Sequence, residues 1–477
     1  MHVFWGTHRR PMLLATCAVT FLGCGCTNGV VTRDAGRLAE AYVLFSPLLS
    51  TTTYLVDRDG RVVHEWQSDF APGASVHFLD DGSLLRCARQ PNVPRYRGGG
   101  LGGRLQEFAW DGRLTWDWII ASGERLQHHD VAPLPGGNVL VLAWEAKTRE
   151  EALRAGRVPR RVGSAGLWPE CVFEVRPVRP RGGVIVWEWH LWDHLVQEVH
   201  TGLENYGRIA DHPGRIDING DSAPQSWTTA VLDRLKSLGY IGTDTTASDL
   251  DPDFVHANAI AYNPRLDQIA LTVNHYHEVW VIDHSTTTAE AATGAGGRRN
   301  RGGDLLYRWG NPAAYARGLA ADQRLFGPHD GRWIPDGYPG AGHLLVFNNG
   351  LGSRRRASSV IEIDPPLDDG RYRIGPRAPF EPVSPAWTYP PPSAKPFYAD
   401  FISGAHRLPN GNTFITAGPE GRFFEVTAAG DTVWEYENPY SGTAPNPAGD
   451  PPRSVFRATL IPGNHPGLAN RGLARRR

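Results

Sequence analysis

The chain has little methionine, few patterns typical of long helices and almost no surplus of charge of either sign. Its 477 residues include 2 Met and carry a formal net charge of −1. A net charge near zero excludes the basic field of a nucleic-acid-binding surface, so we expect no nucleic-acid partner. With 41% hydrophobic and 21% charged residues, the composition is that of a globular protein rather than a disordered one.

Cysteine is almost absent once an N-terminal signal is set aside. Of the 5 Cys in the sequence, only Cys87 and Cys171 lie beyond that signal. Two cysteines exclude a multi-cysteine zinc site, and in an oxidising compartment they can form one disulfide. The sequence leaves that disulfide open and slightly favours two separate buried thiols.

Hydrophobic runs long enough to span a bilayer are also lacking. A charged start, His8 to Arg10, precedes the short apolar run "MLLATCAVTFLGCGC". This combination is typical of a secretory signal peptide, here over residues 1–26. The stretch "FLGC" resembles a lipoprotein processing box, with Phe21 where leucine is usual. We therefore expect an exported protein, either in the periplasm or attached to the membrane through a lipid anchor at Cys24.

Tryptophan and glycine are abundant, with 16 Trp and 54 Gly. Many aromatic residues and many glycines, without long helical patterns, are typical of an all-β protein with many turns. Lining up the tryptophans shows a strand of alternating apolar and polar residues that recurs six times. The six copies read "VVHEW" to Trp66, "LTWDW" to Trp118, "VIVWEW" to Trp189, "LLYRW" to Trp309, "PAWTY" to Tyr389 and "TVWEY" to Tyr436.

A second signature follows each aromatic strand: a histidine, a turn rich in Asp, Asn, Gly or Pro, and an apolar strand. The sixth copy, "SVFRATLIPGNHPG", has Arg457 nearby and no histidine in register. A third strand often follows and ends in a turn that leads to the next aromatic strand. The five histidine copies contain His77, His129 (preceded by His128), His256, His329 and His406.

This order of strands, repeated six times, predicts a six-bladed β-propeller, with seven blades as the alternative count. The aromatic positions would supply packing between neighbouring blades, because one blade cannot bury its faces alone. The leading segment "AYVLFSPLLSTTTYLVDRDG" indicates strands that pair with the C-terminal copy. Such pairing closes the ring and removes exposed sheet edges.

Two stretches break the repeat. Residues from about 200 to 253 contain "SWTTAVLDRLKSLGYIG", which predicts a helix with Ser226 as its N-cap and Gly242 near its end. The segment "EEALRAGR" at 150–157 predicts a shorter helix. We expect both insertions on one face of the propeller, where functional loops gather.

Equivalent positions in successive blades lie at one radius around the propeller axis. If the repeated histidine faces the central channel, the five histidines converge on one cavity. Such a cluster can cap strands, bind zinc, copper or iron, bind an anion together with arginines, or supply a neutral histidine nucleophile. Asp130 and Asp330 directly follow two of the histidines, and "NNGLGSRRR" supplies Arg354, Arg355 and Arg356.

Several longer motifs carry a family resemblance: "HHDVAPLPGGNVL", "WHLWDHLVQ", "HANAIAYNPRLDQIALT", "GGDLLYRWGNP", "NNG" and "GAHRLPNGNTFI". From about residue 41 to 467 the chain resembles the bacterial PAPS-independent arylsulfotransferases, which are exported six-bladed propellers. The resemblance implies transfer of a sulfuryl group from a phenolic sulfate ester to a phenol acceptor, without a cofactor or a metal. It also implies a ping-pong reaction through a sulfohistidine.

The resemblance places the nucleophile in the motif matched by "GAHRLPNG", so His406 is the expected sulfohistidine. His256 and His329 match two further active-site histidines of the family, and Arg354 is the nearest match to its arginine. Cationic or N–H donors aimed at the sulfuryl oxygens lower the barrier by about 3–4 kcal/mol each. The residues expected to bind substrate are His77, His129, Arg355 and Arg356.

One departure is that no cysteine follows Cys171, whereas the best-known members carry a disulfide near the active site toward the C-terminus. Two other classes of function stay open. One is a histidine-lined, metal-dependent hydrolase, and the other is a non-catalytic propeller that binds partners through its loop face. The sequence also leaves open whether the protein forms a homodimer.

Overall fold

The structure, a computed structural model, describes residues 28–473 apart from 94, 223–226, 353–354, 369, 392–395 and 443–451. The predicted signal peptide with Cys24, the predicted N-cap Ser226 and Arg354 therefore lie outside the described residues. No helix in the described part is long and apolar enough to cross a membrane.

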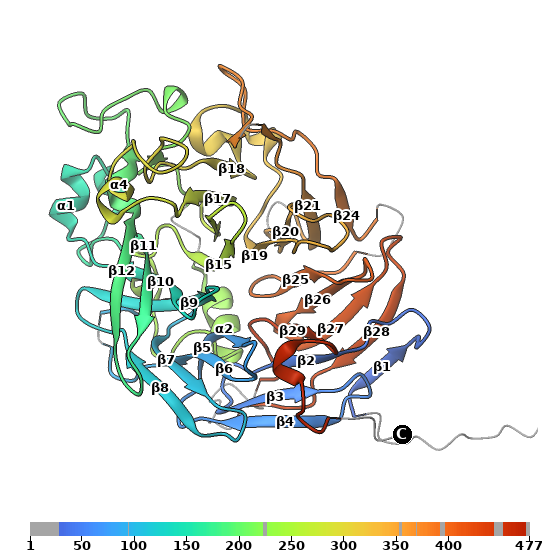
Figure 1. The fold of residues 1–477 in the computed structure, drawn as a ribbon. Coiled ribbons are helices and arrows are strands. Elements are labelled where there is room, and N and C mark those ends of the chain that lie inside the picture. Colours follow the sequence, from blue (N-terminus) through green and yellow to red (C-terminus); the bar gives the residue numbers. More distant parts are fainter. Residues whose placement is uncertain are drawn as a thin grey trace, which may run out of the picture.

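Six sheets stand around a central axis, which makes the molecule a six-bladed β-propeller and confirms the predicted fold class and blade number (Figure 1). From the axis outward, the first three blades are β29 (Thr459–Pro462), β2 (Ala41–Phe45), β3 (Thr52–Val56) and β4 (Val62–Gln67); β5 (Pro72–Phe78), β6 (Leu84–Arg89), β7 (Gly103–Phe108) and β8 (Leu114–Ile119); and β9 (Arg125–Pro133), β10 (Val139–Glu145), β11 (Glu170–Pro177) and β12 (Gly183–His190). The last three are β15 (Ala257–Asn263), β16 (Gln268–Val273), β17 (Glu278–Asp283) and β18 (Tyr307–Trp309); β19 (Pro328–Trp333), β20 (Leu344–Asn348), β21 (Ser359–Ile363) and β24 (Trp387–Tyr389); and β25 (Gly404–Arg407), β26 (Thr413–Ala417), β27 (Arg422–Val426) and β28 (Thr432–Glu437).

The C-terminal strand closes the ring. β29 pairs antiparallel with β2, with Thr459 opposite Leu44 and Pro462 opposite Ala41. This confirms the predicted pairing between the leading segment and the C-terminal copy. β1 (Val30–Arg33) pairs with β28 and adds a fifth strand to the outer edge of the sixth blade.

The six aromatic strands of the repeat are the fourth strands of the six blades, counted from the axis. One tryptophan of each donates its indole N–H to a backbone carbonyl of the next blade, and the last bond returns to the first blade. The recurring tryptophan therefore joins neighbouring blades, as the repeat predicted, and satisfies its own polar group while its ring is packed. The bonds run from Trp66 to Ala109, Trp116 to Gly182, Trp189 to Gly303, Trp309 to Pro382, Trp387 to Ala428 and Trp434 to Arg58.

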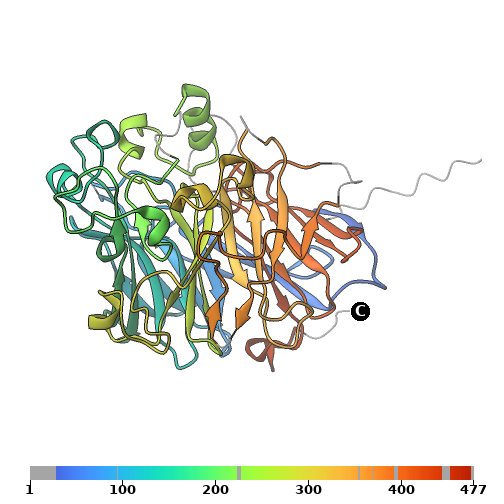
Figure 2. The ribbon, with the colours of Figure 1, turned by 90° about the horizontal axis from the view of Figure 1, so that it is seen from above.

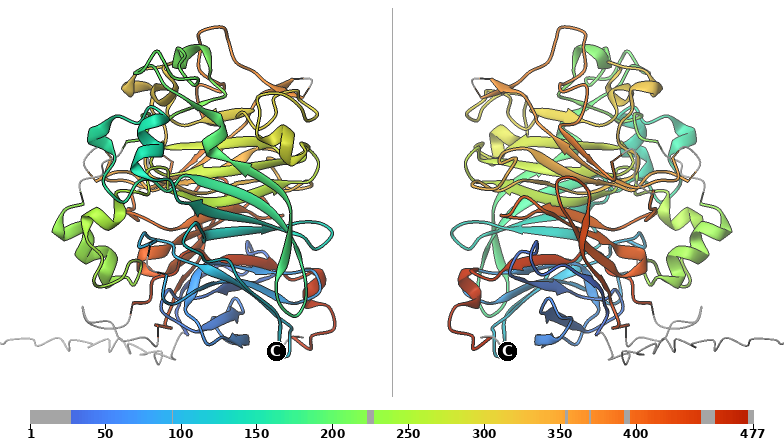
Figure 3. Two further views of the ribbon diagram at one scale, coloured as in Figure 1. Left: turned by 90° about the vertical axis from the view of Figure 1, so that its left-hand side faces the viewer. Right: turned by 90° about the vertical axis from the view of Figure 1, so that its right-hand side faces the viewer.

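Long connections between the strands carry the helices. α1 (Arg149–Arg154) and α2 (Thr229–Ser237) form where helices were predicted, and α2 is capped by Thr228, which accepts a bond from the Val231 N–H. The two helices lie on the same face of the propeller (Figures 2 and 3). The other short elements are β13 (Leu195–Val196), β14 (Ile216–Asp217), α3 (Ala247–Leu250), α4 (Thr288–Ala291), β22 (Leu367–Asp368) and β23 (Arg371–Tyr372).

Both cysteines of the described chain are buried free thiols. Cys87 on β6 and Cys171 on β11 belong to the same hydrophobic cluster between the second and third blades. Burial raises the pKa of the Cys87 thiol to about 12, so this group has little thiolate character. The two separate thiols that the sequence favoured are confirmed.

Candidate active site

Two cavities in the described part of the chain lie at opposite ends of the inner strands. The larger, about 730 Å³, is lined by residues at or before the starts of the inner strands and by the insertion that carries α2. The smaller, about 330 Å³, is lined mainly by residues at the far ends of the same strands. The two cavities therefore differ in the side chains that the repeat presents to them.

Three charged side chains from three blades meet in the channel, and two of them line the smaller cavity. Arg457, just before β29, donates hydrogen bonds of 2.8 Å to Asp130 on β9 and of 2.8 Å to Asp330 on β19. Although burial opposes it, the Arg457 guanidinium holds the pKa of Asp130 far below its usual range. A buried salt-bridge cluster therefore stands in the channel, with Arg457 and Asp330 at the wall of the smaller cavity.

Histidines, an arginine and aromatic rings line the larger cavity. Arg234 of α2 is the only arginine among the described lining residues. The histidines are His256, His275, His277 and His329, and the aromatic residues are Trp227, Tyr240, Tyr398 and Phe401. A cavity of this size and lining suits a small molecule that has both an aromatic and an anionic part.

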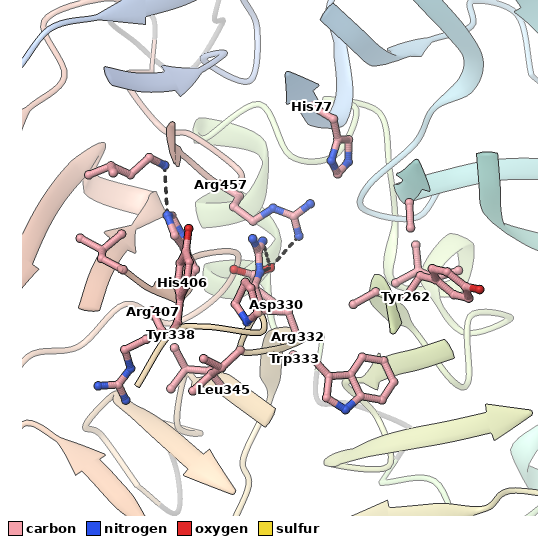
Figure 4. A pocket seen from close by; sticks show the side chains of 18 of the residues that line it. His77, Tyr262, Asp330, Arg332, Trp333, Tyr338, Leu345, His406, Arg407 and Arg457 are labelled. Atoms are coloured by element: carbon pink, nitrogen blue, oxygen red, sulfur yellow. Dashed lines mark hydrogen bonds and ion pairs between the residues drawn. The ribbon is translucent and has the colours of Figure 1, made fainter. Parts of the chain in front are cut away.

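The five repeated histidines do not converge on one cavity. His256 and His329 line the larger cavity, and the His129 ring packs behind them, with its centroid 4.7 Å from that of His256. His77 and His406 line the smaller cavity instead (Figure 4). The prediction of a single five-histidine cavity is therefore wrong.

A difference in strand register explains the separation. His406 stands three residues before Pro409 of its turn, whereas His329 stands six residues before Pro335. Because side chains alternate along a strand, an odd shift moves a residue along the channel and changes the direction of its side chain. In the sixth blade, the position equivalent to His329 is occupied by Ser403. Its buried hydroxyl forms hydrogen bonds with backbone groups.

Asn349 fixes the protonation of the His329 ring. The Asn349 side-chain amide donates to the carbonyls of Ala399 and Ile402, so its Oδ1 faces His329 Nδ1 at 2.7 Å. Nδ1 must therefore carry the proton, and Nε2, which has no hydrogen-bond partner among the described residues, keeps its lone pair. Burial lowers the pKa of His329 to about 3, so the ring is neutral at pH 7.

His256 forms a dyad with Asp253. Its Nδ1 donates to the Asp253 carboxylate over 2.5 Å, and its Nε2 lies 3.4 Å from the Tyr240 hydroxyl. Although burial opposes it, the nearby charge of His256 lowers the pKa of Asp253. An ionised carboxylate therefore orients the ring, which can give or take a proton at the cavity wall.

A backbone N–H forms a hydrogen bond with His406 at Nε2, the nitrogen through which His406 would have to attack sulfur. Its Nε2 accepts a hydrogen bond of 3.1 Å from the Leu460 N–H (Figure 4). Burial, with Arg332 and Arg457 nearby, lowers the pKa of His406 well below its usual value. The neutral ring thus carries its proton on Nδ1, and its other lone pair is occupied.

Comparison with known proteins decides the family. The family described as Arylsulfotransferase (ASST) matches residues 42–439. The chain belongs to the arylsulfotransferase family. No curated protein matches the chain.

Solved structures match over most of the length at low identity. One is a protein of unknown function from Bacteroides caccae, 12% identical, covering 89% of this chain and 99% of that one, with a TM-score of 0.45. Another is a protein from Lactobacillus plantarum, at 9% identity, 88% and 99% coverage and a TM-score of 0.41. Virginiamycin B lyase from Staphylococcus aureus matches at 9% identity, 87% and 89% coverage and a TM-score of 0.35. At these scores the likenesses carry no argument about function.

The other predicted site residues are spread over several places. His77 lies 3.2 Å from the Asp130 carboxylate in the channel. Arg355 is half-buried, and burial lowers its pKa. Arg356 places its guanidinium 5.9 Å from the ring centroid of Tyr398, which lines the larger cavity. The predicted catalytic Arg354 lies outside the described residues.

Sequence reasoning missed four groups at the larger cavity. Asn349 belongs to the "NNG" motif, and Asp253 stands three residues before His256, so spacing could have drawn attention to both. Arg234 and Tyr240 come from the insertion, which no other blade repeats, and no periodic signal marks them. The functional wall of the cavity therefore combines repeat residues with residues unique to one connection.

Proposed function

We propose that this arylsulfotransferase moves a sulfuryl group from a phenolic sulfate ester to a phenol acceptor in its larger cavity, through a covalent intermediate on His329. The observation that carries the proposal is the neutral His329 ring, whose Nε2 lone pair is left free because Asn349 holds the proton on Nδ1. In the first half-reaction the N–S bond forms, the S–O bond of the ester breaks, and the phenol leaves with a proton. A second phenol then reverses these steps.

The charges around the cavity support this chemistry. A sulfuryl group in transfer spreads negative charge over its oxygens, much as a phosphoryl group does. Arg234 and a protonated His256, which both line the cavity, supply donors for those oxygens or for the departing phenol. One well-aimed donor lowers the barrier by about 3–4 kcal/mol.

The nucleophile proposed here differs from the one that the family resemblance implies. For His406 to attack sulfur through Nε2, it must first lose the hydrogen bond from Leu460. It also lies in the smaller cavity, away from His256 and His329. The role of His406 stays a prediction, and the experiment below distinguishes the two histidines.

A metal-dependent hydrolase finds less support in the cavity. Within the part of the chain that the structure describes, no three His, Cys, Asp or Glu side chains are grouped so that they could hold a metal ion. The histidines of the larger cavity bond to an amide and a carboxylate instead.

We also propose that the protein is exported, on the strength of its N-terminal sequence. The charged start and the short apolar run of residues 1–26 are typical of a signal peptide. Labelling cells with a lipid precursor tests the anchor, because a Cys24→Ser variant would lose any label that Cys24 carries.

The assay that tests the function follows transfer from p-nitrophenyl sulfate to a phenol acceptor in three proteins: wild type, His329→Gln and His406→Gln. Glutamine keeps polarity and similar size but cannot form the intermediate. We expect His329→Gln to lose about 10³-fold or more in kcat and His406→Gln to keep most of its activity. The reverse pattern would return the nucleophile to His406, and an inactive wild type would overturn the proposed function.

A further inference from the structure

A continuous hydrogen-bonded chain runs from His256 into the interior of the molecule. The Tyr240 hydroxyl lies 3.4 Å from His256 Nε2 and 2.8 Å from His129 Nε2. His129 Nδ1 lies 2.8 Å from His128 Nδ1, and His128 Nε2 lies 2.7 Å from a carboxylate oxygen of Glu170. Five titratable side chains therefore connect the cavity wall to a buried acid.

The contact between the two Nδ1 atoms restricts how protons can be arranged, because one nitrogen must donate and the other accept. If Glu170 is protonated, it donates to His128, and each bond then points outward, ending with the Tyr240 hydroxyl donating to His256. If Glu170 is ionised, every bond reverses, and a doubly protonated His256 donates to Tyr240. The two arrangements hold the same number of protons, so exchanging them moves one proton between His256 and Glu170.

The inner part of the chain is closed to solvent. His128, His129 and Glu170 are 0% exposed, and the Trp144 ring stacks on the His128 ring with centroids 4.0 Å apart. Burial, with Asp253 nearby, raises the pKa of Glu170 well above its usual range, and burial lowers the pKa of His128 to about 3. At rest, a protonated Glu170 and neutral rings are therefore favoured, and the stored proton exchanges poorly with water.

Two consecutive glycines, Gly99 and Gly100, make room for this arrangement. A Cβ at Gly100 would lie 2.1 Å from His129 Nε2, and a Cβ at Gly99 would lie 2.1 Å from the Tyr240 ring. Gly100 also has a φ of +73°, which favours glycine over other residues. The backbone at 99 and 100 can therefore approach the rings of Tyr240 and His129 closely, because a Cβ at either position would clash with these rings.

Other titratable and charged groups face the chain from neighbouring elements. They are neighbours of the chain and do not form links in it. These groups are Arg89 beside Tyr240, Cys171 beside Glu170, Asp253 and His275 beside His256, and His329 beside His129.

We propose that Glu170, His128, His129 and Tyr240 form a proton relay that stores the proton exchanged at His256. The inference rests on the proposed sulfuryl transfer. In the first half-reaction, the Glu170 proton moves along the chain and leaves His256 with a proton on Nε2, which His256 gives to the phenol oxygen as the S–O bond breaks. In the second, the acceptor phenol gives its proton to His256 as its oxygen attacks sulfur, and a proton returns to Glu170.

Comparing two donors tests the relay kinetically. Tyr240→Phe interrupts the chain but keeps the His256–Asp253 dyad. For the sulfate ester of an unactivated phenol, whose oxygen has a pKa near 10, kcat should fall about 100-fold, because the leaving oxygen needs a proton. For p-nitrophenyl sulfate, whose phenol is more acidic, the loss should be much smaller. Glu170→Gln should show the same contrast, because glutamine cannot release a proton.

Tyr276→Phe provides the matched control. It also removes the hydroxyl of a buried tyrosine. That hydroxyl donates a hydrogen bond of 2.7 Å to the Asp217 carbonyl, and Tyr276 is not one of the residues that line the larger cavity. The kcat of Tyr276→Phe should match that of the wild type for each of the two donors. Equal losses for both donors in Tyr240→Phe, or no loss for either, would overturn the relay.

An infrared titration tests the relay without any turnover, so it separates failure of the relay from failure of the proposed function. The wild type should show the band of a protonated buried carboxyl, and Glu170→Gln should lack it. The pH midpoint of this band should shift in Tyr240→Phe and stay unchanged in Tyr276→Phe. A missing band, or a midpoint that Tyr240→Phe leaves unchanged, would contradict the relay even in an active enzyme.

Discussion

At the residue scale, the proton position on each imidazole ring decides what the ring can do. His329 and His406 come from the same sequence repeat and both are buried and neutral. Asn349 holds the proton of His329 on Nδ1, whereas the Leu460 N–H occupies Nε2 of His406. One ring therefore presents a free lone pair, and the other is used to join two inner strands.

Asn349→Ala should lower kcat for sulfuryl transfer about 10- to 100-fold, the usual effect of removing a group that orients a reactive histidine. The ring loses the acceptor that fixes its proton on Nδ1. The control is Asn348→Ala, which removes an equally buried neighbour whose Oδ1 accepts from the Phe326 N–H. Kinetics and melting temperatures of both variants would be compared. Equal activities would argue against an orienting role for Asn349.

The sequence could predict the type and period of the site residues but not their level in the channel. His256 and His329 were found from the repeat, and they do share a cavity. His406 was aligned with them because it also precedes a turn, although its turn follows three residues later rather than six. Because side chains alternate along a strand, this shift of three residues changes the direction of the side chain and its level in the channel. The residue type alone does not show the shift.

At the element scale, the fourth strands of the blades, counted from the axis, hold the ring together. In each of the six, a tryptophan combines ring packing with an N–H bond to the next blade. These bonds explain why the aromatic repeat was the clearest signal in the sequence. They also explain why it predicted the number of blades, since each blade needs its own link to its neighbour.

Trp116→Phe should destabilise the protein by about 1–3 kcal/mol, because it leaves the Gly182 carbonyl without its indole donor and leaves a small cavity. Trp118→Phe, on the same strand at a half-buried position, is the matched control and should cost less. Denaturant unfolding of the two variants measures the difference. A larger loss in Trp118→Phe would contradict the linking role of Trp116.

At the scale of the whole molecule, the ion cluster of Arg457, Asp130 and Asp330 ties three blades together inside the channel. Arg457→Met should destabilise the protein by about 3–5 kcal/mol, because it removes the buried guanidinium that both carboxylates share and leaves Asp130 with His77 and Asp330 with Arg332. Adding Asp130→Asn and Asp330→Asn should recover part of that loss. If the triple variant were less stable than Arg457→Met, the buried charges would not be the cause.

Stability should depend on pH through the buried histidines. Burial lowers the pKa values of His128 and His329 to about 3 and of His275 to about 4. Below pH 6.5 the unfolded chain takes up protons at these positions while the folded chain does not. Stability should therefore fall as pH drops from about 6.5 toward 4, by up to about 1.4 kcal/mol per pH unit for each ring.

His190 should make the stability of the protein depend on pH on the alkaline side of neutrality. Hydrogen bonds to Glu145 and then Glu188 raise its pKa to about 9, so its contribution is complete below pH 6.5 and is lost as pH rises through 9. Denaturation curves from pH 4 to 10 should thus show a maximum near neutrality. A stability that stays constant from pH 7 down to 4.5 would contradict the neutral buried rings.

The global architecture was the part that the sequence predicted best. Six aromatic strands and a leading segment that pairs with the last copy were enough for the blade number and the ring closure, because both follow from repetition. The insertion that supplies Arg234 and Tyr240 could be located but not placed against the cavity. Its contacts depend on packing between parts of the chain that share no periodic pattern.

The most direct test of the central claim is the mass of the protein after incubation with an aryl sulfate donor and no acceptor, followed by peptide mapping under alkaline conditions. The proposed reaction predicts one added sulfuryl group, located on His329, and its loss when a phenol acceptor is supplied. An adduct on His406, or no adduct in a protein that still transfers sulfuryl groups, would contradict it.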